Sequence, residues 1–315
     1  MNEMQNHSKM EGPGLPEDHT NRMARARLSL DGLSVGDAFG EDFFRWSLAI
    51  DVLVSARVLP RSPWIYTDDT TMALSIVEVL DATGRIDQDA LADAFARRYA
   101  DEPGRGYGGT AQTILDAIGG GIPWRFASGE AFDGEGSMGN GGAMRVGPVG
   151  AYFADDLPAA VENARASAEV THMHPDGQAG AIAVAVAAAT AYQTRDLPAG
   201  EAAGQLLKAV LAHTPDGPTR GGLMAIGRIG LECSLESAVD ALGNGSNVIS
   251  SDTVPFCIWA ACRHLRNYQD AMWETVSALG DRDTTCAIVG SIVAMAVGQG
   301  GIPKDWIAAR EPLPL

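Results

Sequence analysis

The sequence of 315 residues has few aromatic side chains, which make up 6% of it. It also lacks sustained alternation of polar and apolar residues, which is the pattern of a half-buried strand. These two absences disfavour a β-sandwich. Glycine is abundant, with 37 residues, and apolar residues make up 46% of the chain. The composition therefore predicts tightly packed helices with small contact residues rather than a disordered chain.

Basic side chains are scarce, with 23 Lys and Arg against 40 Asp and Glu and a net charge of −17. Nucleic acids and anionic membranes are poor partners for such a chain, because phosphate contacts need Lys and Arg. The apolar runs at 179–191 and 286–298 are too short to span a bilayer. Residues 1–20 lack the apolar core of a signal peptide. We therefore expect neither a nucleic acid nor a membrane as a partner.

Cysteine is also rare, and none of the four forms a CxxC pair. Three of them fall in apolar helical stretches, where a free thiol acts as a small buried side chain. Reduced thiols predict a cytoplasmic location. The four are Cys233, Cys257, Cys262 and Cys286.

Helical patterns cover most of the chain after residue 22. Residues 1–22 are polar and contain glycines and prolines, so we expect a flexible tail there. The remainder, 23–315, is expected to be one all-α domain, a compact multi-helix fold. We predict irregular segments at 42–66 and 214–224. We predict helices at 25–38, 72–80, 88–99, 111–118, 142–154, 158–170, 175–193, 199–212, 234–242, 254–266, 269–279 and 286–297.

Two acidic turns stand at helix starts far apart in the sequence. The first contains Thr67, Asp68 and Asp69, and the second contains Asp281, Asp283 and Thr284. Helix capping explains one acid at each start, but two neighbouring carboxylates repel each other. A hard divalent cation would remove that repulsion and take all these oxygens as ligands. The pair of turns therefore predicts the two halves of one metal site.

Four further motifs precede helices or end them. Asp37, in Gly36-Asp37-Ala38-Phe39-Gly40, either bonds within a turn or supports the metal turn, and Gly40 suits a helix C-cap. Glycine loops lie at 104–109, around Tyr107, and at 139–142. The second is either a glycine-rich helix entry or a place where backbone N–H groups and the following helix end bind a phosphate. His172 is either a structural histidine or a donor to a sugar hydroxyl.

The motifs at 36–40, 67–70, 139–145, 171–175 and 280–284 together resemble those of ADP-ribosylglycohydrolases, in the same order. The resemblance spans about residues 26–300. It implies an all-α fold and a centre of two Mg²⁺ ions, or Mn²⁺. It also implies an enzyme that hydrolyses the bond between ADP-ribose and a side chain of a mono-ADP-ribosylated protein.

Carried over by motif, the resemblance assigns roles to individual residues. The metal ligands would be Thr67, Asp68, Asp69, Asp281, Asp283 and Thr284, with Asp283 bridging. The substrate-binding residues would be Gly139, Asn140, Gly141 and Gly142 at the diphosphate, His172 at a ribose, and Phe256 near the adenine, with Tyr107 as a further candidate. The catalytic candidates are Asp281, Asp283, Asp68 and Glu41.

One position departs from the family pattern. Relatives carry a glutamate about four residues after the first motif, where this chain has Phe44, and Glu41 is the candidate replacement. Three alternatives remain open at this point. They are an immunity-type protein that binds and blocks a toxin ADP-ribosyltransferase, a hydrolase of a small ADP-ribose derivative, and a terpene-cyclase-like Mg²⁺ enzyme. The glycine loops and the His motif do not fit the last of these.

Overall fold

The computed structural model describes residues 14–46 and 50–314. As the sequence predicted, this part of the chain is helical, with two isolated backbone bridges and no strand. The helices are α1 (His19–Asp42), α2 (Ile50–Ser55), α3 (Asp68–Thr83), α4 (Gln88–Asp101), α5 (Gly109–Gly119), α6 (Trp124–Gly129), α7 (Gly141–Met144), α8 (Gly147–Tyr152), α9 (Leu157–Glu169), α10 (Pro175–Gln193), α11 (Ala199–His213), α12 (Pro218–Ile229), α13 (Leu235–Leu242), α14 (Ser250–Arg263), α15 (Tyr268–Ser277), α16 (Arg282–Val297) and α17 (Lys304–Ala309), with 3₁₀ turns η1 (Phe43–Trp46) and η2 (Gln299–Gly301).

Helices α1 and α16 pack with their backbones in contact. Glycines at every fourth position of α1, Gly32, Gly36 and Gly40, face α16. A Cβ on Gly36 would lie 2.2 Å from the carbonyl oxygen of Cys286, and one on Gly40 would lie 2.3 Å from that of Arg282. Glycine is required at these positions because any side chain would push the two helices apart. The expected C-cap at Gly40 is therefore wrong, since this glycine lies inside α1 and serves helix packing.

The core is built largely from small side chains on α10, α14 and α16. In α10, every residue from Ala179 to Ala191 is buried, and most of them are alanine or valine. Such side chains let helices approach closely, so few large aromatics are needed to fill the interior. One aromatic cluster does occur, where Phe39 stacks on Trp306 and meets Trp273 edge-on.

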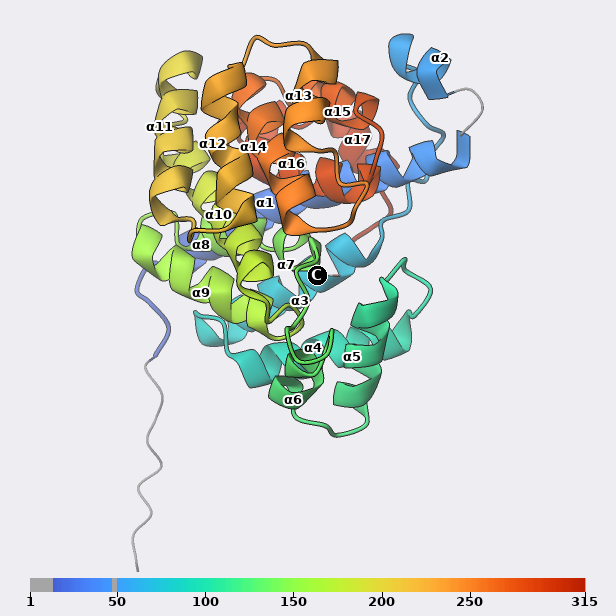
Figure 1. Ribbon diagram of the computed structural model, residues 1–315, viewed down its shortest axis with the longest axis vertical. Coiled ribbons are helices and arrows are strands. Elements are labelled where there is room, and N and C mark those ends of the chain that lie inside the picture. The colour runs from blue at the N-terminus through green and yellow to red at the C-terminus, as the bar shows by residue number, and fades with distance from the viewer. Residues whose placement is uncertain (1–13, 47–49, 315) are drawn as a thin grey trace, which may run out of the picture.

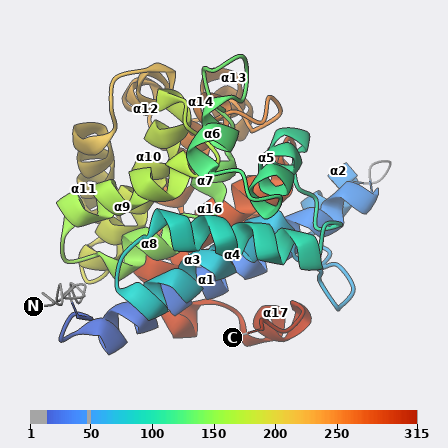
Figure 2. The same ribbon diagram turned by 90° about the horizontal axis from the view of Figure 1, so that it is seen from below.

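The helices form two groups around the site. In Figure 1 the teal to green helices α4, α5 and α6 lie at one end, and the yellow to red helices α10 to α16 lie at the other. Helix α3 lies between these groups in the same view. Figure 2 shows the C-terminal helix α17 on the outside of the molecule, beside α1.

Several expected boundaries differ from the structure. Helix α1 begins at His19 rather than near Arg25, so residues 19–22 of the expected tail are helical. The rest of that tail up to residue 13 lies outside the described residues. The expected helix 142–154 is two short helices, α7 and α8, separated at Arg145 and Val146.

The expected loop at 214–224 is partly helix α12. Its prolines and glycines do not interrupt the helix. Pro218 occupies the first helical turn, where the missing N–H has no partner to lose. Gly222 faces α14, and a Cβ there would lie 2.5 Å from the side chain of Pro255. The segment 42–66, expected to be irregular, contains η1 and α2. In the described part of the chain, no helix combines the length and apolarity needed to cross a membrane.

Candidate active site

A cavity of about 680 Å³ lies between the two helix groups and is lined by residues from distant parts of the chain. Both acidic turns reach it, through Asp68 of the first and Asp281, Asp283 and Thr284 of the second. The structure therefore brings the two turns to one place. The other lining residues include Gly106, Gly108, Gly109, Phe132, Glu135, Gly139, Asn140, Gly141, Thr171, His172, Asn247, Val248 and Ile249.

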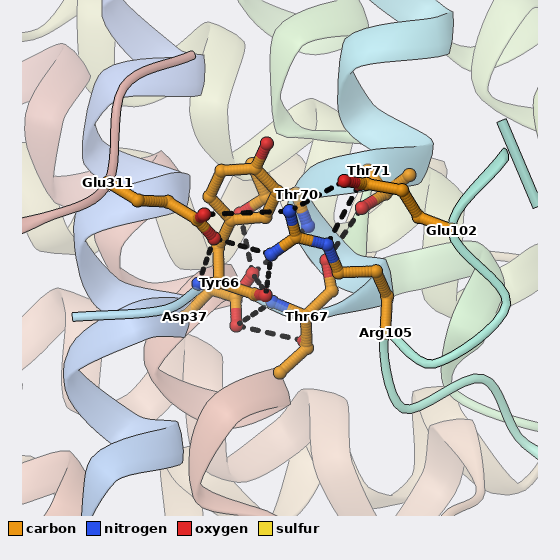
Figure 3. Close-up of polar contacts among 8 residues, drawn as sticks. All are labelled: Asp37, Tyr66, Thr67, Thr70, Thr71, Glu102, Arg105 and Glu311. Carbon is orange, nitrogen blue, oxygen red and sulfur yellow. Dashed lines mark hydrogen bonds and ion pairs between the residues drawn. The ribbon is translucent and has the colours of Figure 1, made fainter. Parts of the chain in front are cut away.

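The first turn is held by Asp37, a fully buried side chain of α1 (Figure 3). The Asp37 carboxylate accepts hydrogen bonds from the backbone N–H of Thr67, at 3.0 Å, and of Thr70, at 3.1 Å. The hydroxyls of the same two threonines donate to it at 2.9 and 2.5 Å. Asp37 therefore supports the acidic turn, which is the second of the two roles that its sequence allows.

Two further residues hold the segment that enters this turn. Glu311, beyond the last helix, accepts the backbone N–H of Tyr66 at 3.0 Å. Arg105 pairs with Glu311, donates to the Tyr66 carbonyl at 3.0 Å, and accepts the Asp68 N–H with its own carbonyl at 2.7 Å. Figure 3 shows the contacts of Arg105, from the glycine loop, and of Glu311, from the C-terminal segment, with Tyr66 and with each other.

The second turn is held mainly by loop backbone and by one side chain. Gly280 has φ +62°, and a Cβ there would lie 2.2 Å from the carbonyl oxygen of Asn244. Asn140, from the second glycine loop, donates its side-chain amide to Oδ2 of Asp281 at 2.7 Å. Asp281 is the N-cap residue of α16 but makes no side-chain capping bond. Simple helix capping therefore does not account for this carboxylate.

The carboxylates of the two turns repel one another in a buried setting. Burial raises the pKa of Asp68 to about 7, with Asp37 and Asp281 adding to the effect. Burial also raises the pKa of Asp69 well above its usual value, helped by Asp37 and Asp283. The pKa of Asp283 is likewise raised by burial and then by Asp281. Each raised pKa means that the ionised form is disfavoured there unless positive charge is supplied.

The donor atoms suit a hard cation in kind. Among the described residues, Oδ1 of Asp69 and Oδ1 of Asp283 are buried without a hydrogen-bond partner. Threonine hydroxyls stand beside both acids, at Thr67 and Thr284, and carboxylate and hydroxyl oxygens are the ligands that Mg²⁺ takes. Within 14–46 and 50–314, however, no three His, Cys, Asp or Glu side chains are placed, as they stand, to hold one ion. A cation would therefore have to draw these side chains inward.

The second glycine loop runs along one wall of the cavity. It pairs with a segment that the sequence did not single out, since Ser250 N–H donates to Met138 O at 3.0 Å and Asn140 N–H to Val248 O at 3.2 Å. The helix that follows has four residues, Gly141–Met144. The expected long helix after this loop is therefore wrong, and Gly139, Asn140 and Gly141 line the cavity.

His172 lies against this loop with its ring edge at the cavity. Its Nδ1 is 2.7 Å from the hydroxyl of Thr171. Burial lowers its pKa to about 3, with Arg145 contributing, so the imidazole is neutral at neutral pH. A Cβ on Gly141 would lie 2.7 Å from Cε1 of His172. The imidazole therefore fits in this position only because residue 141 has no side chain.

Six of the expected site residues do not line the cavity, and two of them, Thr67 and Asp69, are buried in the first turn. Phe256 is fully buried against Trp259 in the core, so the expected contact with adenine is wrong. Gly142 is buried behind the loop, and Glu41 is half-buried and does not line the cavity. Tyr107 is buried too, and its hydroxyl has no partner within the described part of the chain.

Other residues of the site were not predicted from the sequence. Arg105 lies in the first glycine loop, but the sequence predicted no role for its side chain. Glu311 belongs to no motif, and it meets Tyr66 across 245 residues. Phe132 and Val248, at the cavity, have φ +52° and +56°, which a sequence does not reveal for non-glycine residues. Arg145 and Thr171 lie inside motifs that the sequence did single out, but their contacts depend on the fold.

The fold and the site together define a class of protein. Residues 18–312 match the ADP-ribosylglycohydrolase family, and the chain belongs to it. Membership indicates an enzyme that hydrolyses ADP-ribose linkages.

Individual relatives agree with this assignment. Human ADP-ribosylhydrolase ARH3 is 30% identical over 333 residues, covering 90% of this chain and 88% of the relative. The ADP-ribosylarginine hydrolase Tri1 of Serratia proteamaculans is 25% identical, covering 93% and 76%. A solved structure titled ADP-ribosylglycohydrolase-related protein complex has the same fold, with a TM-score of 0.65 at 23% identity over 92% of this chain and 93% of that one.

Proposed function

We propose that this protein is a Mg²⁺-dependent hydrolase that releases ADP-ribose from a side chain of a mono-ADP-ribosylated protein. The observation that carries the proposal is the meeting of two acidic turns in one cavity, with two buried carboxylate oxygens unpartnered among the described residues. The names of the relatives support the substrate class, since one is an ADP-ribosylhydrolase and another an ADP-ribosylarginine hydrolase.

The charge of the cavity supports a cation requirement. The described residues that line it include Asp68, Glu135, Asp281 and Asp283 but no Lys or Arg. A diphosphate brought into such a cavity would meet uncompensated negative charge. Two bound Mg²⁺ ions, or Mn²⁺, would compensate it, orient the ribose hydroxyls and make a bound water more acidic.

The chain's own residues have the following roles in this proposal. The backbone of Gly139 and Gly141 and the ring of His172 would bind the ADP-ribose. Asp281, which accepts a hydrogen bond from Asn140, or its neighbour Asp283 would accept a hydrogen bond from the attacking water and aim it at C1″. The bond from C1″ to the side chain breaks through an oxocarbenium-like transition state. Water adds its oxygen to C1″, and the departing side chain takes up the proton.

Turnover with defined substrates tests the proposal. The purified protein is incubated with proteins ADP-ribosylated on arginine or on serine, and with a small ADP-ribose derivative, before and after chelation with EDTA. We expect release of ADP-ribose from a protein substrate, loss of release with EDTA, and recovery with Mg²⁺ or Mn²⁺. Full activity after exhaustive chelation would overturn the metal requirement. Binding of ADP-ribose without release from any substrate would instead favour a blocking protein, and release from the small derivative alone would reject the protein substrate.

A further inference from the structure

Behind His172 lies a buried arginine that does not reach the cavity. Arg145 is fully buried, and its guanidinium covers the ring of Phe95 at 4.5 Å. Its Nη2 donates to the Ser167 carbonyl at 2.8 Å and to the Thr171 hydroxyl at 2.9 Å. Burial lowers the pKa of Arg145 to about 9, so it is still charged at neutral pH. Two hydrogen bonds therefore link this guanidinium to the histidine, one between Arg145 and Thr171 and one between Thr171 and His172.

The direction of these bonds follows from what each group can donate. Arginine only donates, so the Thr171 oxygen accepts from Arg145 and its hydroxyl proton points elsewhere. Thr171 is fully buried, and the neighbouring acceptor for that proton is Nδ1 of His172, 2.7 Å away. The opposite arrangement would leave a buried O–H without an acceptor, which is unfavourable. Nδ1 is therefore the acceptor.

With Nδ1 accepting, the proton of the neutral imidazole is on Nε2. This atom makes no hydrogen bond to any residue in the parts of the chain that the structure describes, while the His172 side chain lines the cavity. A Cβ on Gly139 would lie 3.1 Å from Nε2, and one on Gly141 would lie 2.9 Å from it. The two glycines therefore leave open the ring edge that carries the proton.

We propose that Arg145 and Thr171 are positioning residues that fix His172 as a neutral Nε2–H donor, aimed between Gly139 and Gly141 at an oxygen acceptor of the bound ligand. The ligand assignment rests on the proposed function, where that acceptor belongs to ADP-ribose. The tautomer does not rest on it. A neutral donor in this place hydrogen-bonds the ligand without adding a charge that would repel a cation bound nearby.

The tautomer can be read directly by long-range ¹H–¹⁵N correlation of histidine-labelled protein without ligand. The chain has six histidines, so His172→Gln assigns the His172 signals by their disappearance. We expect the ¹⁵N chemical shift of Nδ1 in the unprotonated range and that of Nε2 in the protonated range. Both shifts should stay constant from pH 5 to pH 8, an interval in which a histidine with the reference pKa of about 6.5 would titrate. Protonation at Nδ1, or titration of both nitrogens in this interval, would overturn the inference and leave the proposed hydrolase activity untouched.

The role of Thr171 is tested by binding of ADP-ribose, measured by calorimetry. Thr171→Val keeps the shape but removes the hydroxyl, so the ring loses its fixed orientation and affinity should fall about tenfold, the worth of one hydrogen bond. Thr171→Ser restores the hydroxyl and should bind within about twofold of the wild type. Thr190→Val is the matched control, because its buried hydroxyl bonds only to Val186 of its own helix among the described residues.

Two outcomes separate positioning from mere stabilisation. If Thr171→Val binds like the wild type and its His172 signals are unchanged, the positioning role is rejected. If Thr171→Val and Thr190→Val lose affinity equally, the effect is one of stability and the proposal also fails. Lack of ADP-ribose binding by the wild type would instead reject the proposed function, and the tautomer measurement would still stand.

Discussion

The two acidic turns carry the same kinds of side chain, yet they are held in different ways. In the first turn, the backbone N–H groups of Tyr66, Thr67 and Asp68 donate to Glu311, Asp37 and Arg105 respectively. In the second, the Asp281 N–H donates to a loop carbonyl, Asn244 O, at 3.3 Å. The first turn is thus anchored by three distant parts of the chain, and the second by a loop that packs closely against it.

The carboxylates of the first turn are also more deeply buried than those of the second. Asp69 is 1% exposed and Asp68 is 9% exposed, whereas Asp281 and Asp283 are both half-buried at the cavity. The first turn is therefore preorganised before a ligand arrives, while the carboxylates of the second have room to adjust. Preorganised groups lose little freedom on binding, and adjustable groups can complete a coordination shell. We call the first turn, with Asp68 and Asp69, the fixed half of the site, and the second turn, with Asp281 and Asp283, the adaptable half.

The largest expected effect comes from the adaptable half. Asp283→Asn removes a charge but keeps size, and it leaves the N-cap residue of α16, Asp281, unchanged. Because Oδ1 of Asp283 is buried and unpartnered among the described residues, we expect turnover to fall by orders of magnitude. Apparent Mg²⁺ affinity should fall as well, while the Tm holds or rises because a crowded carboxylate is gone. Kinetics and calorimetry measure both effects. Wild-type turnover in this variant would reject the metal mechanism.

A second variant addresses the fixed half. In Asp37→Asn, one oxygen becomes an NH₂ group that faces donors, so at least two of the bonds from Thr67 and Thr70 are lost. We expect a loss of about 2–4 kcal/mol in the free energy of unfolding and a marked loss of activity. Denaturant titration measures the first quantity. Asp93→Asn, at an exposed position of α4, is the control and should change stability by no more than about 0.5 kcal/mol. Equal effects of the two substitutions would contradict the special role of Asp37.

The difference between the turns also explains what the sequence could predict. Both turns were recognisable, because acids followed by threonines at a helix start form a local pattern. The bounds of α10 were predicted as well, since Pro175 marks its start and an uninterrupted apolar run follows. The residues that anchor the first turn were harder to predict from the sequence. Asp37 lies in a recognisable motif, but Glu311 is one acid among many in an acidic chain and is placed only by the fold.

The wrong predictions have a common physical reason, which is that close packing changes the meaning of small residues. Gly40 suggested a helix end, but it lies inside α1 because α16 approaches there. Gly222 and Pro218 suggested a loop, but they belong to α12, where one faces Pro255 and the other starts the helix. Phe256 suggested a ligand contact, but Trp259 and the core enclose it. Local residue type does not distinguish a contact with a neighbouring helix from a contact with a ligand.

The smallest expected effect tests whether the C-terminal segment contributes to the fixed half. Arg105 pairs with two acids, of which Glu311 also binds the Tyr66 N–H, while Glu102 touches no part of the turn among the described contacts. Glu311→Gln weakens the pair and turns an NH₂ group toward Arg105, so the segment entering the turn loosens. Glu102→Gln removes the same charge from the same arginine, and its side chain is 50% exposed, where an ion pair contributes about 0–1 kcal/mol.

We therefore expect Glu311→Gln to lower turnover by a few-fold and to weaken apparent Mg²⁺ affinity, with a loss of about 1–2 kcal/mol in the free energy of unfolding. Glu102→Gln should leave turnover and Mg²⁺ affinity near the wild-type values. Steady-state kinetics at varied Mg²⁺ distinguishes the two, because a general weakening of Arg105 would affect both variants alike. If the two variants behave identically, the C-terminal segment does not support the turn. The fixed half would then depend on Asp37 and on the Arg105 backbone alone.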